Sequence, residues 1–169
     1  PTFKVRYGEP VMVRRTNCLD PNHVGVGNPT VSTHLHNAHT PAESDGNPLG
    51  DYQVNPGSYK DYHYPNVYAG YSLNQHLDPV TKKPWEAQST LWYHDHMLDY
   101  TSQNVYMGLA GFYLMFNEYD TDDETGATFP ATNFRLPSGN FDIPLIFIDM
   151  KFDAAGYRVF DALNLDGML

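Results

Sequence analysis

Two histidine pairs give this sequence its clearest chemistry. Each has the form His-x-His, with His34 and His36 in one and His94 and His96 in the other. In an extended strand, side chains at positions i and i+2 leave the same face, so each pair directs two imidazoles into one space. Neutral imidazole suits copper, zinc, iron and nickel, so histidine alone does not select the metal. One pair is weak evidence, but two pairs in one domain predict a metal site shared by all four histidines.

Other residues near the pairs have structural explanations beside functional ones. Asp95 lies between two histidines, where its carboxylate either orients an imidazole or points away from it on the alternating strand. His39 is interpreted first as a hydrogen-bonded loop residue. The single cysteine, Cys18, excludes an internal disulfide, and we expect a small thiol that is buried or partly buried.

Length and composition bound the class of protein. The 169 residues suffice for one domain and part of a second. The 13 glycines and 13 prolines interrupt every apolar run before it reaches membrane-spanning length, so no membrane insertion is expected. The net charge of -10 would repel nucleic acid and anionic lipid, so neither is an expected partner.

Short β-rich runs between turn signals predict an all-β fold, either a sandwich or a barrel. No helical period is sustained for long enough to predict a helix. The expected strands are residues 10–16, 30–36, 59–64, 89–94, 111–117, 143–150 and 157–160.

A change of composition predicts a domain boundary. Residues 119–141 are rich in Asp, Thr, Pro, Gly and Asn, which is typical of an interdomain linker. We therefore expect one domain over residues 1–118 and the first strands of an incomplete second domain over residues 142–169. The apolar run at residues 143–148 is interpreted as the first of these strands, and too few residues follow it to form a second core.

Four ordered motifs surround the histidines, at residues 34–46 (HLHNAHTPAESDG), 62–66 (YHYPN), 91–96 (LWYHDH) and 104–113 (NVYMGLAGFY). Together they resemble the first domain of bacterial laccase-type multicopper oxidases, in the branch of the spore-coat laccases and bilirubin oxidases. The likeness covers nearly the whole chain. It implies a cupredoxin fold, a Greek-key β-barrel or sandwich, joined to a second cupredoxin domain.

The resemblance also implies roles for individual residues. His34 matches the type 2 copper ligand of the family. His36 and His94 match ligands of one type 3 copper, and His96 matches a ligand of the other. Asp45 matches a carboxylate that assists proton delivery during dioxygen reduction, a reaction that consumes protons. Because Ser-Asp-Gly at residues 44–46 is also ordinary turn chemistry, a role in the turn alone stays open.

Part of the family's copper machinery is missing from this chain. The Cys flanked by His that forms the type 1 site is absent, and so are the two carboxy-terminal His-x-His motifs. The resemblance implies that the remaining cupredoxin domains of the same protein, or a complementary chain, supply the other ligands. We expect the chain to be a fragment of a longer oxidase and to be inactive by itself.

The leading hypothesis is an oxidoreductase module that couples one-electron oxidation of phenols, aromatic amines or low-valent metal ions to reduction of dioxygen. The alternative is a non-catalytic copper-binding or structural cupredoxin module. A zinc or iron hydrolase is disfavoured because no convincing general-base carboxylate accompanies the pairs.

Two further expectations come from comparison with the family pattern. The resemblance implies export to the periplasm, the exterior or the spore or cell surface, although no signal peptide is visible within the sequence. Residues 67–86 look like an insertion between the histidine pairs. This insertion is predicted to line a substrate path, to cover a neighbouring domain or to be exposed to solvent.

Overall fold

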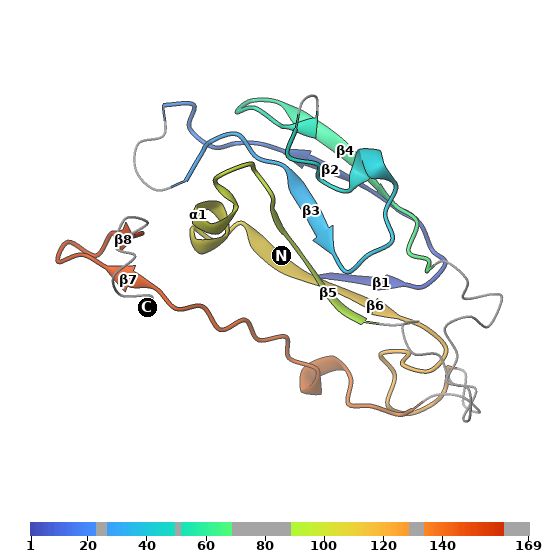
Figure 1. Ribbon diagram of the computed structural model, residues 1–169. Helices are drawn as coiled ribbons and strands as arrows, with labels where there is room; N and C mark the ends of the chain where they lie inside the picture. Colours follow the sequence, from blue (N-terminus) through green and yellow to red (C-terminus); the bar gives the residue numbers. More distant parts are fainter. Residues whose placement is uncertain (23–26, 50–51, 69–88, 129–133, 161–169) are drawn as a thin grey trace, which may run out of the picture.

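The computed structural model describes residues 1–22, 27–49, 52–68, 89–128 and 134–160. Within these residues the chain forms strands, one α-helix and two short 3-10 helices, arranged as Figure 1 shows. The elements are β1 (Phe3–Arg6), β2 (Val11–Thr16), β3 (Thr33–His36), η1 (Ala42–Ser44), β4 (Tyr59–Tyr64), β5 (Ser89–Asp95), α1 (Thr101–Tyr106), β6 (Ala110–Phe116), η4 (Gly139–Phe141), β7 (Lys151–Phe152) and β8 (Arg158–Val159).

Two sheets make up the body of the domain. The larger has the strand order β1-β6-β5-β3, and the β2–β4 pair lies on one side of it (Figure 1). All pairings within these sheets are antiparallel except that of β1 with β6. The parallel pairing joins β1 to a strand more than 100 residues later and places β1 at the edge of the sheet opposite β3.

Alternating side chains explain why these segments form half-buried strands. In β2 the residues at odd positions are partly buried and those at even positions are exposed, which is the period of a strand with one face on a core. The core cluster takes its members from both sheets, among them Leu35, Tyr62, Leu91 and Tyr113. The predicted all-β fold class is confirmed, and the core lies between the two sheets.

Buried tyrosines give this core polar anchor points. The Tyr113 hydroxyl donates to Asn66 Oδ1 at 2.6 Å, and the Tyr62 hydroxyl accepts from the Thr33 N–H at 3.2 Å. Burial raises the pKa of Tyr64 and of Tyr113 to about 12, so both phenols stay neutral at physiological pH. The bond to Thr33 ties the smaller sheet to the strand that carries the first histidine pair.

Most of the predicted strands are confirmed. Residues 10–16, 30–36, 59–64, 89–94, 111–117 and 157–160 contain β2, β3, β4, β5, β6 and β8, with ends that differ by a few residues. The sequence did not predict β1, whose four residues are held by pairing with distant β6. Nor did it predict α1, whose six residues are too few to establish a helical period.

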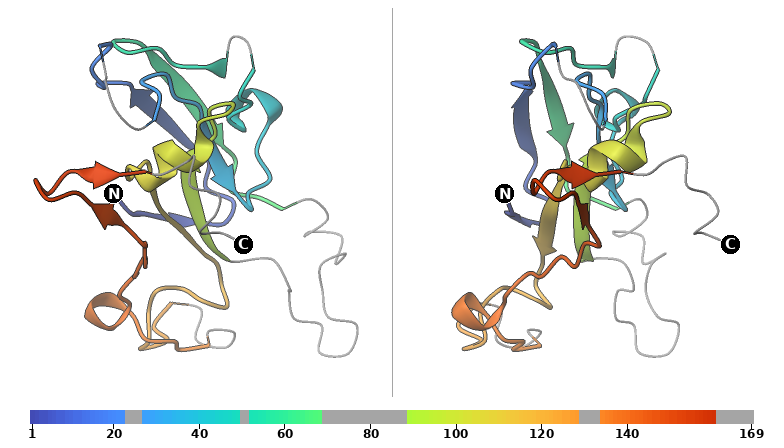
Figure 2. Two further views of the ribbon diagram at one scale, coloured as in Figure 1. Left: turned by 60° about the vertical axis from the view of Figure 1, so that its left-hand side comes forward. Right: turned by 90° about the vertical axis from the view of Figure 1, so that its left-hand side faces the viewer.

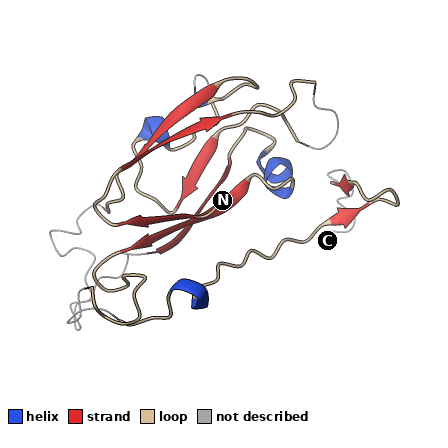
Figure 3. Cartoon of the chain, turned by 180° about the vertical axis from the view of Figure 1, so that it is seen from behind, coloured by secondary structure: helices blue, strands red, loops and turns tan. Residues whose placement is uncertain are grey.

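The strand expected at residues 143–150 is wrong. This segment has no strand partner among the described residues, and it runs beside the domain as an extended loop (Figure 3). Ile143, Leu145 and Phe147 are 67%, 66% and 91% exposed. An apolar run becomes a strand only when another strand satisfies its backbone groups. The predicted boundaries at residues 118 and 141 stay predictions.

The β7–β8 hairpin rests against α1, as Figure 2 shows from two sides. The Tyr106 hydroxyl accepts from the Lys151 N–H at 2.6 Å and donates to the Val159 carbonyl at 2.8 Å. Arg158 also donates to the Met107 carbonyl, just beyond the end of the helix. Among the described residues no helix is both long and apolar enough to cross a bilayer.

Candidate metal centre

The pairing of β3 with β5 brings the two histidine pairs together. His34 and His36 lie on β3, His94 lies on β5, and His96 follows the last residue of that strand. In the antiparallel register His34 is opposite His94. Leu35, between the first two histidines, is 1% exposed and belongs to the core. The histidines therefore leave the other face of the sheet, away from the core between the sheets.

The four imidazole rings form one cluster. Nδ1 of His36 lies 3.2 Å from Nε2 of His94, and one ring nitrogen of His34 joins them in a group whose members lie within 4.8 Å of one another. The centroid of the His34 ring is 5.5 Å from that of His36 and 5.4 Å from those of His94 and His96. The structure thus brings all four predicted residues to one place.

Backbone carbonyls select the tautomers of two of these rings. Nδ1 of His34 lies 2.7 Å from the Asp45 carbonyl oxygen, and Nδ1 of His94 lies 2.6 Å from the Asp95 carbonyl oxygen. A carbonyl only accepts, so each Nδ1 carries its hydrogen and each Nε2 keeps a lone pair. Burial lowers the pKa of His94, and the neighbouring histidines lower it further. A neutral imidazole with a free Nε2 is the form that binds a metal.

The donor set fits a metal ion such as copper. Two nitrogens 3.2 Å apart can both lie about 2 Å from one ion, the distance known for histidine–zinc bonds. The Nδ1 atom of His96 is buried and has no hydrogen-bond partner among the described residues. Buried polar groups are rarely left unpaired. The cluster therefore offers both a chelating pair and an unsatisfied nitrogen.

Two residues that sequence reasoning did not single out shape the cluster. Trp92 stacks on both neighbouring rings, with its centroid 5.3 Å from that of His36 and 4.3 Å from that of His94. Trp92 precedes His94 by two positions, so the alternation that unites each histidine pair also predicts this side for Trp92. Gly46 has a φ of 76°, and a Cβ there would overlap the Thr33 carbonyl and the backbone nitrogen of His34.

Asp45 lies beside the first histidine. It follows the 3-10 turn η1, its Oδ1 accepts from the Thr40 hydroxyl at 2.8 Å, and the same Oδ1 is 3.2 Å from Nδ1 of His34. The carbonyl of Asp45 is nearer to that nitrogen and holds its hydrogen. The carboxylate side chain is 48% exposed. It therefore belongs to a turn and also connects the cluster with solvent.

The remaining candidates lie outside the ring cluster. The Asp95 carboxylate turns away from the rings and accepts hydrogen bonds from backbone and from an amide, so the second of its two predicted orientations is the observed one. The His39 ring packs edge-on against Tyr68 at 4.8 Å. Cys18 is exposed, so the expected buried or partly buried thiol is wrong, because Asn17 occupies the buried position at the end of β2.

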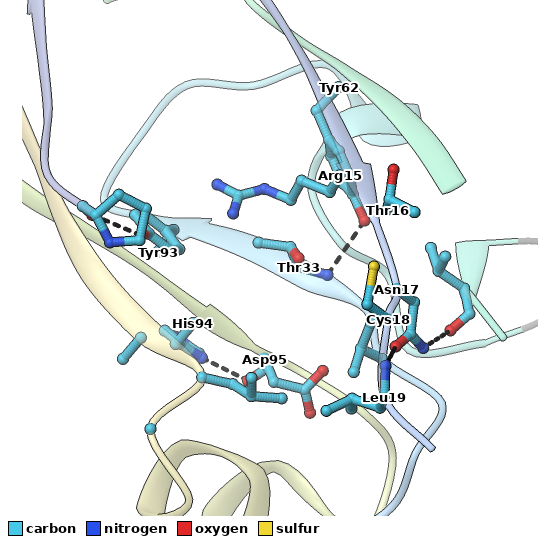
Figure 4. A pocket seen from close by; sticks show the side chains of 16 residues that line it. Arg15, Thr16, Asn17, Cys18, Leu19, Thr33, Tyr62, Tyr93, His94 and Asp95 are labelled. Carbon is cyan, nitrogen blue, oxygen red and sulfur yellow. Dashed lines mark hydrogen bonds between the residues drawn. The ribbon is translucent and has the colours of Figure 1, made fainter. Parts of the chain in front are cut away.

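A cavity of about 290 Å³ lies behind β5, and Figure 4 shows its lining. Of the four cluster histidines, His94 alone lines it. The Arg15 guanidinium lies over the Tyr93 ring at 4.2 Å, a cation–π contact that shields the charge on this side. The metal-binding side of the cluster therefore faces away from this cavity. Residues 69–88, which hold most of the predicted insertion, lie outside the described residues.

Comparison with known proteins places this geometry in a family. No protein-family model matches the chain. The chain is 34% identical to the bilirubin oxidase of Albifimbria verrucaria over 94% of its own length and 21% of that protein's length. It is 32% identical to a laccase of Bacillus stratosphericus over 92% of itself and 28% of the laccase. A laccase of Bacillus subtilis is 30% identical over 92% and 29% of the two lengths.

Solved structures agree with these sequence relatives. A variant of the McoA multicopper oxidase from the hyperthermophile Aquifex aeolicus superimposes with a TM-score of 0.63 over 95% of this chain, at 26% identity. This chain covers 28% of that structure. A multicopper oxidase from Campylobacter jejuni, with a TM-score of 0.51 and 22% identity, shares the fold over 71% of the chain.

The fold is that of a multicopper oxidase cupredoxin domain, and the site is a histidine cluster suited to a metal. Over nearly its whole length the chain is similar to the amino-terminal portion of multicopper oxidases of the laccase and bilirubin oxidase kind. It spans between 21% and 29% of the length of the relatives described above. The resemblance found in the sequence is therefore confirmed, and these relatives contain further portions that this chain does not match.

Proposed function

We propose that this chain supplies half of the ligands of a trinuclear copper cluster, in which His34 binds the type 2 ion. His36 and His94 would hold one type 3 ion together, and His96 would bind the other. One observation carries the proposal: Nδ1 of His36 and Nε2 of His94 face each other at 3.2 Å. These are the two residues that the family resemblance assigns to one copper.

When bound, copper would supply one-electron redox chemistry and the site at which dioxygen is reduced. The residues of this chain perform the supporting tasks. The carbonyls of Asp45 and Asp95 hold the Nδ1 hydrogens of His34 and His94, so that each Nε2 keeps a lone pair free to bind a metal. Trp92 restricts rotation of two of the rings by stacking. Such support from outside the ligand set preorganises a metal site.

Asp45 is proposed to carry protons to the cluster. Its carboxylate is close to His34 and is 48% exposed. It can therefore take up a proton from solvent and pass it toward the cluster. The Thr40 hydroxyl orients one of its oxygens. This role is compatible with its place in the turn, since the turn is what delivers the side chain to His34.

The activity proposed for the whole protein is oxidation of a small reducing substrate coupled to reduction of dioxygen. Two relatives of the chain, a bilirubin oxidase and a laccase, support the proposal of an oxidase that acts on a small electron donor. Other domains of the protein, or a complementary chain, would contribute the type 1 copper and the remaining ligands. By itself, this chain would not turn over substrate.

Substitution of the histidines tests this proposal in the full-length protein that contains the chain. His34→Ala and His94→Ala should each lower the bound copper and abolish dioxygen consumption, since each removes a ligand. His39→Ala is the matched control, because its ring packs on Tyr68 outside the cluster. Copper is measured by elemental analysis of the purified proteins. Copper content and oxygen uptake equal to the unmodified protein in both variants would refute the proposal.

A further inference from the structure

We propose that Asp95 is a positioning residue, whose buried carboxylate fixes the spacing between the two histidine pairs. The inference rests on the proposed function, because it concerns the same cluster. Asp95 is 3% exposed, and it stands between His94 and His96 without touching either ring through its carboxylate. A charge buried so completely needs several donors to offset the loss of water.

Those donors come from three separate segments. Oδ1 accepts from the Ser32 N–H at 2.8 Å, and Oδ2 accepts from the Met97 N–H at 3.0 Å and from Nδ2 of Asn104 at 2.8 Å. Hydrogen bonds to an ionised carboxylate are stronger than those between neutral groups. The carboxylate therefore joins the approach to β3, the turn after β5 and the helix α1 at one point.

Ser32 connects this point directly to both histidine pairs. It precedes His34 by two residues and is fully buried. Its N–H donates to Asp95 Oδ1, and its carbonyl accepts from the His96 N–H at 2.6 Å. A shift of Asp95 would therefore move the start of β3 and the backbone of His96 together.

The main chain of Asp95 carries the same constraint to a third histidine. Its carbonyl oxygen accepts the Nδ1 hydrogen of His94 at 2.6 Å, a contact drawn in Figure 4. Because the carboxylate anchors the residue and the carbonyl holds the ring, the orientation of His94 depends on the anchoring. The carboxylate acts on the cluster through backbone, which explains why it lies away from the rings.

Asn104 extends the network and fixes which of its groups donate hydrogen bonds and which accept them. While its Nδ2 donates to Asp95, its Oδ1 accepts from the Asn28 N–H at 2.8 Å. An amide at position 95 would turn hydrogen-bond donors toward the Met97 N–H and the Asn104 amide, which are donors themselves. Asp95→Asn therefore keeps the size of the side chain and breaks the network.

The experiment uses the full-length protein, stripped of metal and titrated with Cu(II). Asp95→Asn should weaken Cu(II) binding at the histidine cluster by about tenfold or more, within the range known for residues that orient metal ligands. The electron paramagnetic resonance spectrum of the bound Cu(II) should also change. Asp99→Asn is the matched control, because it removes the same charge from an exposed side chain in the following turn. Its spectrum should superimpose on that of the unmodified protein.

Two further variants keep the test decisive. Asn104→Ala leaves Asp95 two of its three donors, so it should change the spectrum in the same direction but less, and it decides the matter if Asp95→Asn fails to fold. The double variant Asp95→Asn with Asn104→Asp restores an acceptor facing the new amide and should recover part of the affinity. A purely structural role would lower thermal stability without altering the copper spectrum.

The failure of this inference differs from a failure of the proposed function. If His34→Ala and His94→Ala lose copper while Asp95→Asn and Asn104→Ala bind Cu(II) with unchanged affinity and spectrum, the positioning role is refuted and the cluster stands. If the histidine variants retain all their copper, the proposed function is refuted first.

Discussion

Similar apolar residues are buried in the two packed sheets and exposed in the segment at residues 143–150. Leu35 and Leu91 lie on paired strands and are almost completely buried, whereas Leu145 and Phe147 lie on an unpaired extended segment and are 66% and 91% exposed. Both regions are rich in residues that favour strands. The comparison teaches that pairing with another strand, more than apolar content, decides which segments of this chain form sheet.

The largest difference in effect is expected when one leucine of each region, Leu35 or Leu145, is replaced by alanine. Leu35→Ala should reduce the free energy of unfolding of this domain by about 2–5 kcal/mol, because it leaves a cavity in the core. Leu145→Ala should change it by less than about 0.5 kcal/mol, as expected for an exposed side chain. Denaturant unfolding of the full-length protein measures both. A loss at Leu145 as large as that at Leu35 would mean that the segment is covered in the whole protein, and the contrast would not hold.

A smaller effect is expected at two glycines, one in each region. Gly46 and Gly139 both have a left-handed φ, of 76° and 60°, so an alanine at either costs about 1–2 kcal/mol of backbone strain. At Gly46 the new Cβ would also overlap the Thr33 carbonyl and the backbone nitrogen of His34, whereas at Gly139 nothing lies within 4 Å. Gly46→Ala should therefore destabilise the protein more and also lower its copper content.

Gly139→Ala serves as the control for this glycine pair, because it adds the same methyl group without a neighbour. Copper analysis and thermal unfolding are measured on both variants. Equal copper content in the two would show that the η1 turn does not hold His34 in place.

The smallest expected effect concerns the contact that joins the two regions. Tyr106→Phe removes the hydroxyl that accepts from the Lys151 N–H and donates to the Val159 carbonyl. The loss is about 1 kcal/mol, typical of one or two exposed hydrogen bonds. Amide hydrogen exchange at Lys151 should become faster, while copper content stays unchanged. Unaltered exchange at that amide would show that the hairpin is held by other contacts.

The candidate site was more predictable than its surroundings. The spacing of His34 and His36, and of His94 and His96, requires only that each pair lie on an extended strand. Trp92 follows from the same alternation, although the sequence alone did not mark it as a ring-stacking residue. The anchoring of Asp95 by Ser32 and Asn104 was not predictable, because its donors come from segments up to 63 residues apart.

The fold divides in the same way. The local sequence pattern identified β2, β4 and β6 as short β-rich runs, which are visible within a few residues. It could not identify β1, which depends on a partner far along the chain, and it wrongly promoted residues 143–150, whose strand-like composition has no partner among the described residues.

The sequence by itself determined the chemistry of this protein: four imidazoles in two doublets, each doublet directed to one side of a strand. The tertiary structure decided that the two doublets meet, since the register that sets His34 opposite His94 is made by hydrogen bonds between strands distant in the chain. Alternation is a local property of the backbone, whereas register is a property of pairs of strands. For this reason the ligand types and a shared site could be predicted from the sequence, whereas the register that places His34 opposite His94 was evident only in the fold.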